Sequence, residues 1–170
     1  MQQPQTPHRS NNFSLFTLNS SLLIISFCLA LSSCDPEKIY ESNVNIPAHG
    51  WHSGEFTNFT VDITDTVSLC NIFINVRNNS KYKYMDLWLF VDIHSPLGYM
   101  ERDTINIMLA DHRGKWLGYG LGNKFDTRIY LRRNVRFPVI GEYVFEYEQA
   151  MRDEVLIGIE DIGLRIERMN

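Results

Sequence analysis

The side chains that could bind a metal or transfer protons are scattered along the chain. His49 and His52 are three residues apart, a spacing that brings two imidazoles to one metal most easily on a helix. Pro47 and Gly50 argue against a helix there, and no serine stands in a nucleophile-elbow pattern. The sequence therefore predicts no metal site, no cofactor and no catalytic residue, and we expect a protein that is not an enzyme.

Paired carboxylates are the one route to hydrolysis that the residues leave open. Asp62 with Asp65, or Asp153 with Glu154, would act as a glycosidase pair only if folding set them face to face across a cleft. Neighbouring positions in the sequence do not establish that geometry, and acidic residues are common in loops. A hydrolase is therefore a third hypothesis, behind the two given below.

Cys34 is the residue whose surroundings indicate a definite chemistry. It follows Leu31-Ser32-Ser33 at the end of an apolar run, and Arg9 is the only strong cation before it. Polar, apolar and small-residue regions in this order are typical of a secretory signal. Leu-Ser-Ser-Cys resembles the bacterial lipobox, in which signal peptidase II cleaves before a cysteine that is diacylated on its sulfur. We predict a lipoprotein signal peptide at residues 1–33 and a lipidated Cys34 that incorporates palmitate.

The length of the apolar run supports cleavage rather than a membrane span. Its densest part, Leu22 to Leu31, is about half of the ~20 residues that cross a bilayer as a helix. Loss of the signal removes Cys28 and, with Cys34 acylated, leaves Cys70 as the lone free thiol, so no disulfide within the chain is expected. The domain must then be held together by its core alone.

The rest of the chain has the pattern of a β-protein. Residues 34–50 are predicted to be the lipidated cysteine and a tether, which lacks a strong period and ends in an entry strand, and 51–170 the folded domain. In that domain apolar residues alternate with polar ones and turn residues lie between the runs. The alternating runs are 59–63, 70–76, 87–93, 105–109, 143–147 and 162–166. They predict a single antiparallel β-sandwich, of jelly-roll or immunoglobulin-like type, with one helical turn at 149–155.

The segment GKWLGYGLG, residues 114–122, is the most unusual stretch of this domain. Its alternating Gly118, Gly120 and Gly122 lack the Lys-Ser/Thr of a P-loop, and no helical pattern follows them. Nucleotide binding is therefore disfavoured. Glycines within a strand instead mark bulges, bends or places where two backbones approach closely.

Aromatic and cationic residues offer contacts for a partner or a glycan. The tryptophans Trp51, Trp88 and Trp116 could stack on sugar rings if exposed, although large aromatics more often close the core of a sandwich. Residues 131–138, LRRNVRFP, concentrate arginines on an acidic chain and could meet an acidic partner or lipid headgroups. The candidate partner or glycan contacts are Trp116, Arg132, Arg133 and Arg136.

Net charge narrows the class of partner. From Cys34 onward the chain has 15 Lys and Arg against 20 Asp and Glu, a net charge of −5. Nucleic-acid binding needs clustered cations that displace counterions, so no nucleic-acid partner is expected. Electrostatics would not draw this domain to anionic lipid either.

Five stretches in order resemble the gliding motility lipoprotein GldH family of Bacteroidota. They cover nearly the whole chain after the lipobox: 50–55 (GWHSGE), 71–91 (NIFINVRNNSKYKYMDLWLFV), 114–122, 135–152 (VRFPVIGEYVFEYEQAMR) and 159–167 (IEDIGLRIE). The resemblance implies a lipid-anchored envelope protein, in the outer membrane, within the set of proteins needed for gliding and tied to type IX secretion. It carries over no catalytic residue, and only Cys34 as a functional position.

Taken together, these observations favour a non-enzymatic accessory or structural component of the gliding machinery. The membrane, through the anchor on Cys34, and other envelope or gliding proteins are the expected partners. A carbohydrate-binding β-sandwich module anchored at the cell envelope is the second hypothesis, and it rests on the tryptophans.

Overall fold

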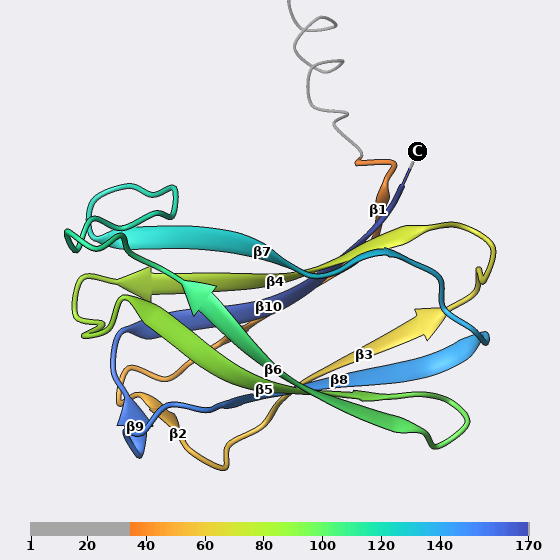
Figure 1. The fold of residues 1–170 in the computed structure, drawn as a ribbon, viewed down its shortest axis with the longest axis horizontal. Helices are drawn as coiled ribbons and strands as arrows, with labels where there is room; N and C mark the ends of the chain where they lie inside the picture. The colour runs from red at the N-terminus through yellow and green to blue at the C-terminus, as the bar shows by residue number, and fades with distance from the viewer. Residues whose placement is uncertain (1–34, 170) are drawn as a thin grey trace, which may run out of the picture. The chain divides into compact units, whose positions relative to one another are not determined.

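The computed structural model describes residues 35–169 as an all-β domain in which no helix occurs (Figure 1). The sandwich itself begins after Pro36. Its strands are β1 (Lys38–Asn45), β2 (Trp51–His52), β3 (Thr57–Ile63), β4 (Cys70–Asn79), β5 (Asp86–His94), β6 (Met100–Met108), β7 (Lys124–Val135), β8 (Gly141–Gln149), β9 (Val155–Leu156) and β10 (Ile159–Arg168).

The strands pair as one long hairpin that has been rolled up. β5 pairs with β6 at the tip, and β4 with β7, β3 with β8, β2 with β9 and β1 with β10 follow outward, all antiparallel. Two lateral pairings, β10 with β4 and β5 with β8, close the roll into sheets of order β1-β10-β4-β7 and β3-β8-β5-β6. This eight-stranded double sheet is the jelly-roll form of the predicted sandwich, and not the seven-stranded immunoglobulin form.

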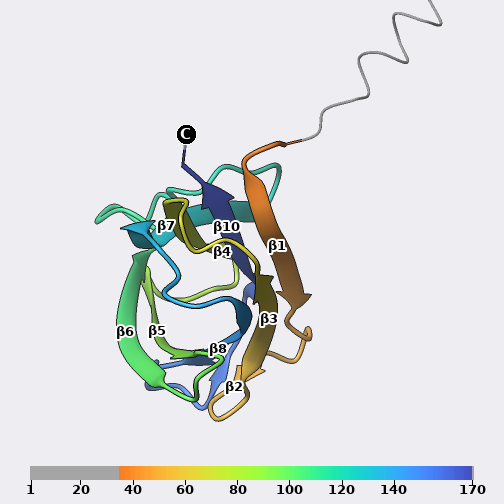
Figure 2. The ribbon, with the colours of Figure 1, turned by 90° about the vertical axis from the view of Figure 1, so that its right-hand side faces the viewer.

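The core lies between the two four-stranded sheets, as Figure 2 shows from the end of the molecule. Alternation supplies it: Ile72, Ile74 and Val76 point inward from β4, and Phe59 and Val61 from β3. The six strands that the alternating runs predict are confirmed. The polar residues that alternate with the inward-pointing ones lie on the outer faces of the sheets. These outer faces therefore hold the side chains that are available for function.

The sandwich begins earlier than the sequence pattern predicts. The entry strand expected within the 34–50 stretch is β1, and it pairs with β10 as part of the sheet from Lys38 to Asn45. The domain therefore starts at residue 38 and not at residue 51. The pattern does not mark where the domain starts, because β1 is an edge strand whose side chains are mostly exposed and which needs no apolar period.

The predicted helical turn at residues 149–155 is wrong. β8 continues to Gln149, a bend follows, and Val155 and Leu156 form β9. The Gln149 side chain stabilises the bend, because its amide donates to the Asp153 carbonyl at 2.9 Å and its oxygen accepts from the Met151 N–H at 2.9 Å. A buried glutamine thus replaces the backbone bonds that a helical turn would have supplied.

Candidate functional site

The outer face of the β1-β10-β4-β7 sheet carries polar residues in rows that cross all four strands. Strand register aligns Asn45, Asp161, Arg77 and Asp126 in one row. The next row holds Asn43, Gly163, Asn75 and Arg128, and the third holds Glu41, Arg165, Phe73 and Tyr130. Directly opposed residues lie about 4.5–5.5 Å apart at Cβ, so the side chains of each row are neighbours across the strands, except at Gly163, which has none.

The first row is an ion-pair cluster around Arg77. Its guanidinium binds Asp126 through two hydrogen bonds, 2.6 Å from Nε to Oδ1 and 3.2 Å from Nη2 to Oδ2. Nη1 donates to Asp161 at 3.2 Å, and Asn45 donates to the other oxygen of the same carboxylate at 3.1 Å. The hydrogen bond to Asp126 raises the pKa of Arg77. This row is a closed arrangement of opposite charges.

The third row forms a second cluster, centred on a buried arginine. Arg165 donates from Nη1 to Glu41 at 2.6 Å and from Nε to Glu167. Glu41 also accepts from Arg128 Nη2 at 3.3 Å. Because Arg165 is largely buried, its two carboxylates compensate a charge that would be costly if left unpaired.

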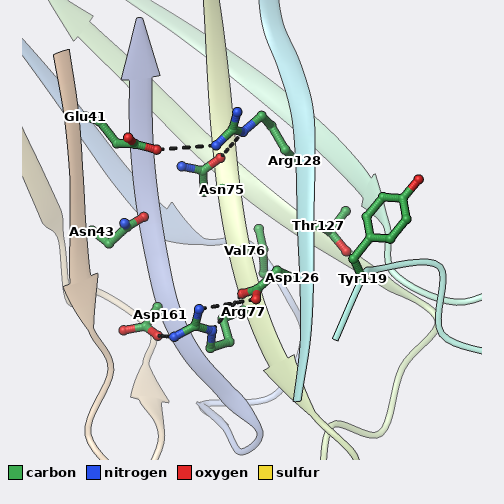
Figure 3. A pocket seen from close by; sticks show the side chains of 10 residues that line it. All are labelled: Glu41, Asn43, Asn75, Val76, Arg77, Tyr119, Asp126, Thr127, Arg128 and Asp161. Atoms are coloured by element: carbon green, nitrogen blue, oxygen red, sulfur yellow. Dashed lines mark hydrogen bonds and ion pairs between the residues drawn. The ribbon is translucent and has the colours of Figure 1, made fainter. Parts of the chain in front are cut away.

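A groove of about 640 Å³ lies between the two clusters (Figure 3). Gly163 stands in its central row, where a Cβ would come within 1.9 Å of Asn43 Oδ1, so the Asn43 side chain lies directly over this glycine. Across the row, Asn75 accepts a hydrogen bond from Arg128 Nε at 2.9 Å. Tyr119, from the segment before β7, contributes to the wall. The groove therefore offers amides, guanidinium groups and one aromatic ring.

The glycine-rich segment is attached to the start of β7 by backbone contact. Tyr119 N donates to Asp126 O at 2.9 Å, and Asp126 N returns a bond to Tyr119 O at 2.7 Å. A Cβ on Gly118 would lie 2.8 Å from Asp126 O, and one on Gly120 would lie 1.8 Å from Lys124 O. The expected role of these glycines, close backbone approach, is confirmed.

The same packing leaves the side chains between the glycines in solvent. Tyr119 is 90% exposed and Leu121 is 93% exposed, and Leu117 is also exposed. Large apolar side chains presented this way on a held backbone are typical of an interaction site. The glycines are needed because one side of the segment lies against β7, which directs the other residues outward.

Among residues 35–169, no three His, Cys, Asp or Glu side chains are grouped so as to hold a metal ion. Of the carboxylate pairs considered, Asp65 is bonded to Ser68 in its own turn, 2.5 Å from Oδ2 to Oγ, and Asp153 and Glu154 lie in the bend after β8. Residues 35–169 also contain no helix that is long and apolar enough to cross a membrane.

The four candidate contact residues are not brought together. Trp116 is partly buried and stacks on Phe125, with ring centroids 5.5 Å apart, near the start of β7. The arginines lie near the other end of that strand. Arg132 binds Glu101 and Asp103 of β6, and Arg133 lies over the Tyr130 ring at 3.8 Å.

Arg136 has a third role. Its Nε donates to the Val67 carbonyl at 2.8 Å and so joins the turn between β3 and β4 to the turn between β7 and β8. Trp51 is buried in the core, and Trp88 is exposed on β5. Cys34 lies outside the described residues, while Cys70 is a buried free thiol.

Sequence reasoning singled out the 114–122 segment that contains Tyr119 but did not bring the groove residues together, although part of the signal was present. Alternation places Asn75 and Gly163 on outward faces of their strands. Which outward residues become neighbours depends on the register of β1, β10, β4 and β7, and β1 and β10 lie near opposite ends of the domain's sequence. The nested pairing supplies that register, and a single sequence does not reveal it.

Comparison with known proteins gives consistent matches over this domain. Residues 38–166 match the GldH lipoprotein family. A relative from Christiangramia forsetii named "Gliding motility lipoprotein GldH homolog" is 35% identical over 87% of this chain and 95% of its own length. "Gliding motility lipoprotein GldH" of Flavobacterium johnsoniae is 30% identical over 88% of this chain and 96% of its own.

The match to a solved structure, an arabinose-bound α-L-arabinofuranosidase, spans 79% of this chain and 21% of the solved chain, with 10% identity and a TM-score of 0.37. A similarity at that level carries no argument about this domain.

Proposed function

Because the chain belongs to the GldH lipoprotein family, we propose that it is a non-enzymatic accessory component of the gliding machinery that works by protein contact. We place it in the outer membrane, held by acyl chains on Cys34, and in association with type IX secretion. The observation that carries the contact role is the outward row of Leu117, Tyr119 and Leu121 on a glycine-packed backbone.

The groove beside this row is consistent with a binding role. Its carboxylates at residues 41, 126 and 161 each accept hydrogen bonds from arginines, so they serve as partners of structural ion pairs. The exposed Tyr119 ring lies beside these ion pairs, because the Tyr119 backbone is hydrogen-bonded to Asp126 of β7. Apolar anchors surrounded by paired charges are the usual composition of a protein–protein interface.

Complementation of a gene deletion tests this proposal. In a gliding host, the wild-type gene should restore colony spreading and secretion, and Tyr119→Ser with Leu121→Ser should not. Asp111→Asn is the matched control. Asp111 lies in the turn before this segment, and an asparagine oxygen can still accept the hydrogen bond from the Arg113 N–H. Equal spreading of the double variant and the wild type would overturn the contact role.

The anchor has its own test. Radiolabelled palmitate should enter the wild-type protein and not Cys34→Ala, which should also leave the membrane fraction. A labelled, membrane-bound Cys34→Ala protein would contradict the anchor. Photo-crosslinking from residue 121 should recover an envelope protein, and recovery of none would count against the contact role.

A glycan-binding role is the second candidate, and one observation favours it. Tyr119 and the amides of Asn43 and Asn75 line the same groove, an aromatic ring beside planar polar groups. Retardation in polysaccharide gels that is lost in Tyr119→Ser would support this role. Trp116 is half-buried against Phe125, so Trp116→Ala is the comparison that separates a surface aromatic from a packing one.

A further inference from the structure

Three turns lie together at the end of the sandwich where β1 begins. Lys38 of β1 is opposite Glu167 of β10, and at the same end β4 starts and β7 finishes. The turns here are 64–69 between β3 and β4, 95–99 between β5 and β6, and 136–140 between β7 and β8. They gather on the right of Figure 1, the side that faces the viewer in Figure 2.

These turns and the first residue of β6 present exposed apolar side chains, here named the apolar edge. It consists of Val67, Leu97, Tyr99, Met100 and Ile140, with Val67 78%, Leu97 65% and Ile140 66% exposed. Across the three turns only Asp65 and Arg136 are charged. An edge of this composition on an acidic domain is unusual for a surface that meets only water.

The apolar edge is held in place by hydrogen bonds. Asp65 accepts bonds from the N–H groups of Val67 and Ser68, at 2.8 and 3.1 Å, and so sets the shape of the first turn. Arg136 joins this turn to the third through the Val67 carbonyl. In the second turn, Ser95 N donates to Tyr99 O at 2.8 Å. The backbone of these turns is therefore already ordered before the apolar side chains are covered, which lowers the entropic cost of covering them.

The second and third turns also touch. A Cβ on Gly141 would lie 3.1 Å from Pro96, so the chain entering β8 packs directly against the β5–β6 turn. The apolar side chains are therefore carried by one connected support and not by three independent loops.

The length of chain before β1 identifies what covers this edge. Only four residue steps separate Cys34 from Lys38, and four residues span at most ~14 Å even when extended. An acyl group on Cys34 thus holds the start of β1 within about that distance of the lipid. We infer that the apolar edge rests in the interface of the bilayer that carries the anchor, an inference that rests on the lipid anchor of the proposed function.

The chemistry of the edge fits a bilayer interface. Its aliphatic side chains gain from leaving water, and tyrosine is a residue that prefers the headgroup region. Within the three turns the charges of Asp65 and Arg136 are opposite in sign, and Asp65 also pairs with Arg168 at 3.5 Å. Attachment therefore depends on apolar contact rather than on anionic lipid. The acyl chains provide the affinity and the edge fixes the orientation, which places the Leu117–Leu121 row at the far end, away from the membrane.

Site-specific fluorescence tests the inference with the mature acylated protein. Leu97→Cys and, as the matched control, Leu121→Cys each receive a nitrobenzoxadiazole label, since Cys70 is buried. The proteins are reconstituted in vesicles of equimolar phosphatidylcholine and phosphatidylethanolamine. Doxyl-labelled lipid should quench the probe at residue 97 and spare the one at residue 121, and aqueous iodide should do the reverse.

A second variant keeps the result independent of the label. Val67→Ser with Ile140→Ser removes two apolar contacts from exposed positions and should lower lipid quenching at residue 97 by roughly threefold. Equal lipid quenching at residues 97 and 121 would overturn the inference. So would a residue-97 probe that is shielded from iodide and also from lipid, because a second copy or another protein would then cover the edge.

Failure of the underlying anchor is recognised separately. Intact-mass measurement reports whether Cys34 carries acyl chains before reconstitution. A non-acylated protein overturns both the anchor and the seating of the edge, whereas an acylated protein with equal quenching at both sites overturns the seating alone.

Discussion

The two ends of the sandwich expose apolar side chains of similar size on very different supports. At the end where β1 begins, Val67, Leu97 and Ile140 stand on three separate turns that side-chain and backbone hydrogen bonds connect. At the opposite end, Leu117, Tyr119 and Leu121 stand on one segment that packs backbone against backbone on β7. The first support is broad, and the second is a single narrow row.

This difference matches the occupants that we propose for the two ends. A bilayer is broad and accepts several separate contacts, whereas a protein partner can recognise a row at strand spacing next to a polar groove. The comparison can be tested, because glycines serve a different purpose at each end. Gly120 allows two backbones to approach closely, and Gly98 allows a left-handed turn.

Gly120→Ala should have the largest effect. Its Cβ would lie 1.8 Å from the Lys124 carbonyl oxygen, a backbone atom that cannot turn aside. We expect a loss of about 2 kcal/mol in the free energy of unfolding, as for other overpacking changes. Urea denaturation measures the loss, and faster hydrogen exchange at Tyr119 and Asp126 would locate it. An unchanged exchange rate would show that the segment does not depend on this close approach.

Gly98→Ala should cost less, because the space around it is open. No heavy atom lies within 4 Å of the added Cβ, but the backbone φ is +80°. The left-handed conformation alone costs about 1 kcal/mol for a residue with a side chain. The same denaturation measurement tests it. A cost equal to that of Gly120→Ala would mean that the two ends are not supported differently.

Much of this architecture could be predicted from the sequence because one side of each inner strand is buried. The runs at 70–76 and 162–166 alternate cleanly, so their strands were placed correctly. Strand β7 also alternates, with Phe125, Ile129 and Leu131 on one side, but its clustered arginines are equally typical of a contact surface. The exposed strand β1 left no pattern to read.

The candidate site was predicted less well, for a physical reason. The arginines 132, 133 and 136 are close in sequence, yet strand alternation and the strand end send them to three surroundings. The groove, by contrast, joins Glu41 to residues 75–77, 126–128 and 161. Spatial neighbours of this kind are set by sheet register, which long-range pairing fixes. By contrast, a local property such as the glycine packing at 118 and 120 was inferred correctly.

Acid should weaken the end of the sandwich where β1 begins, through Asp65. Hydrogen bonds from the Ser68 side chain and from the N–H groups of residues 67 and 68 lower the Asp65 pKa from 3.8 to about 2. A lowered folded-state pKa stabilises the protein above pH 3.8, and that stability is lost as the pH falls toward 2. Wild-type Tm should therefore drop relative to Asp65→Asn between pH 4 and 2. Parallel curves for the two proteins would contradict this effect, which is smaller than either glycine effect.

Serine substitutions of the exposed apolar side chains should change stability least. Tyr119→Ser with Leu121→Ser at one end, and Leu97→Ser with Ile140→Ser at the other, replace side chains that contact mainly water. Each pair should leave the free energy of unfolding within about 0.5 kcal/mol of wild type. Denaturation of the purified proteins measures this directly.

The two pairs should nevertheless fail differently in function, which sharpens the comparison. The pair at 119 and 121 should abolish complementation of spreading while the protein keeps its orientation on vesicles. The pair at 97 and 140 should lower lipid quenching of a probe at Tyr99→Cys while crosslinking from residue 121 persists. If either pair produced both defects with the fold intact, the two ends would not be separate surfaces. Since neither set of side chains supports the core, a loss of function without a loss of stability locates the contact itself.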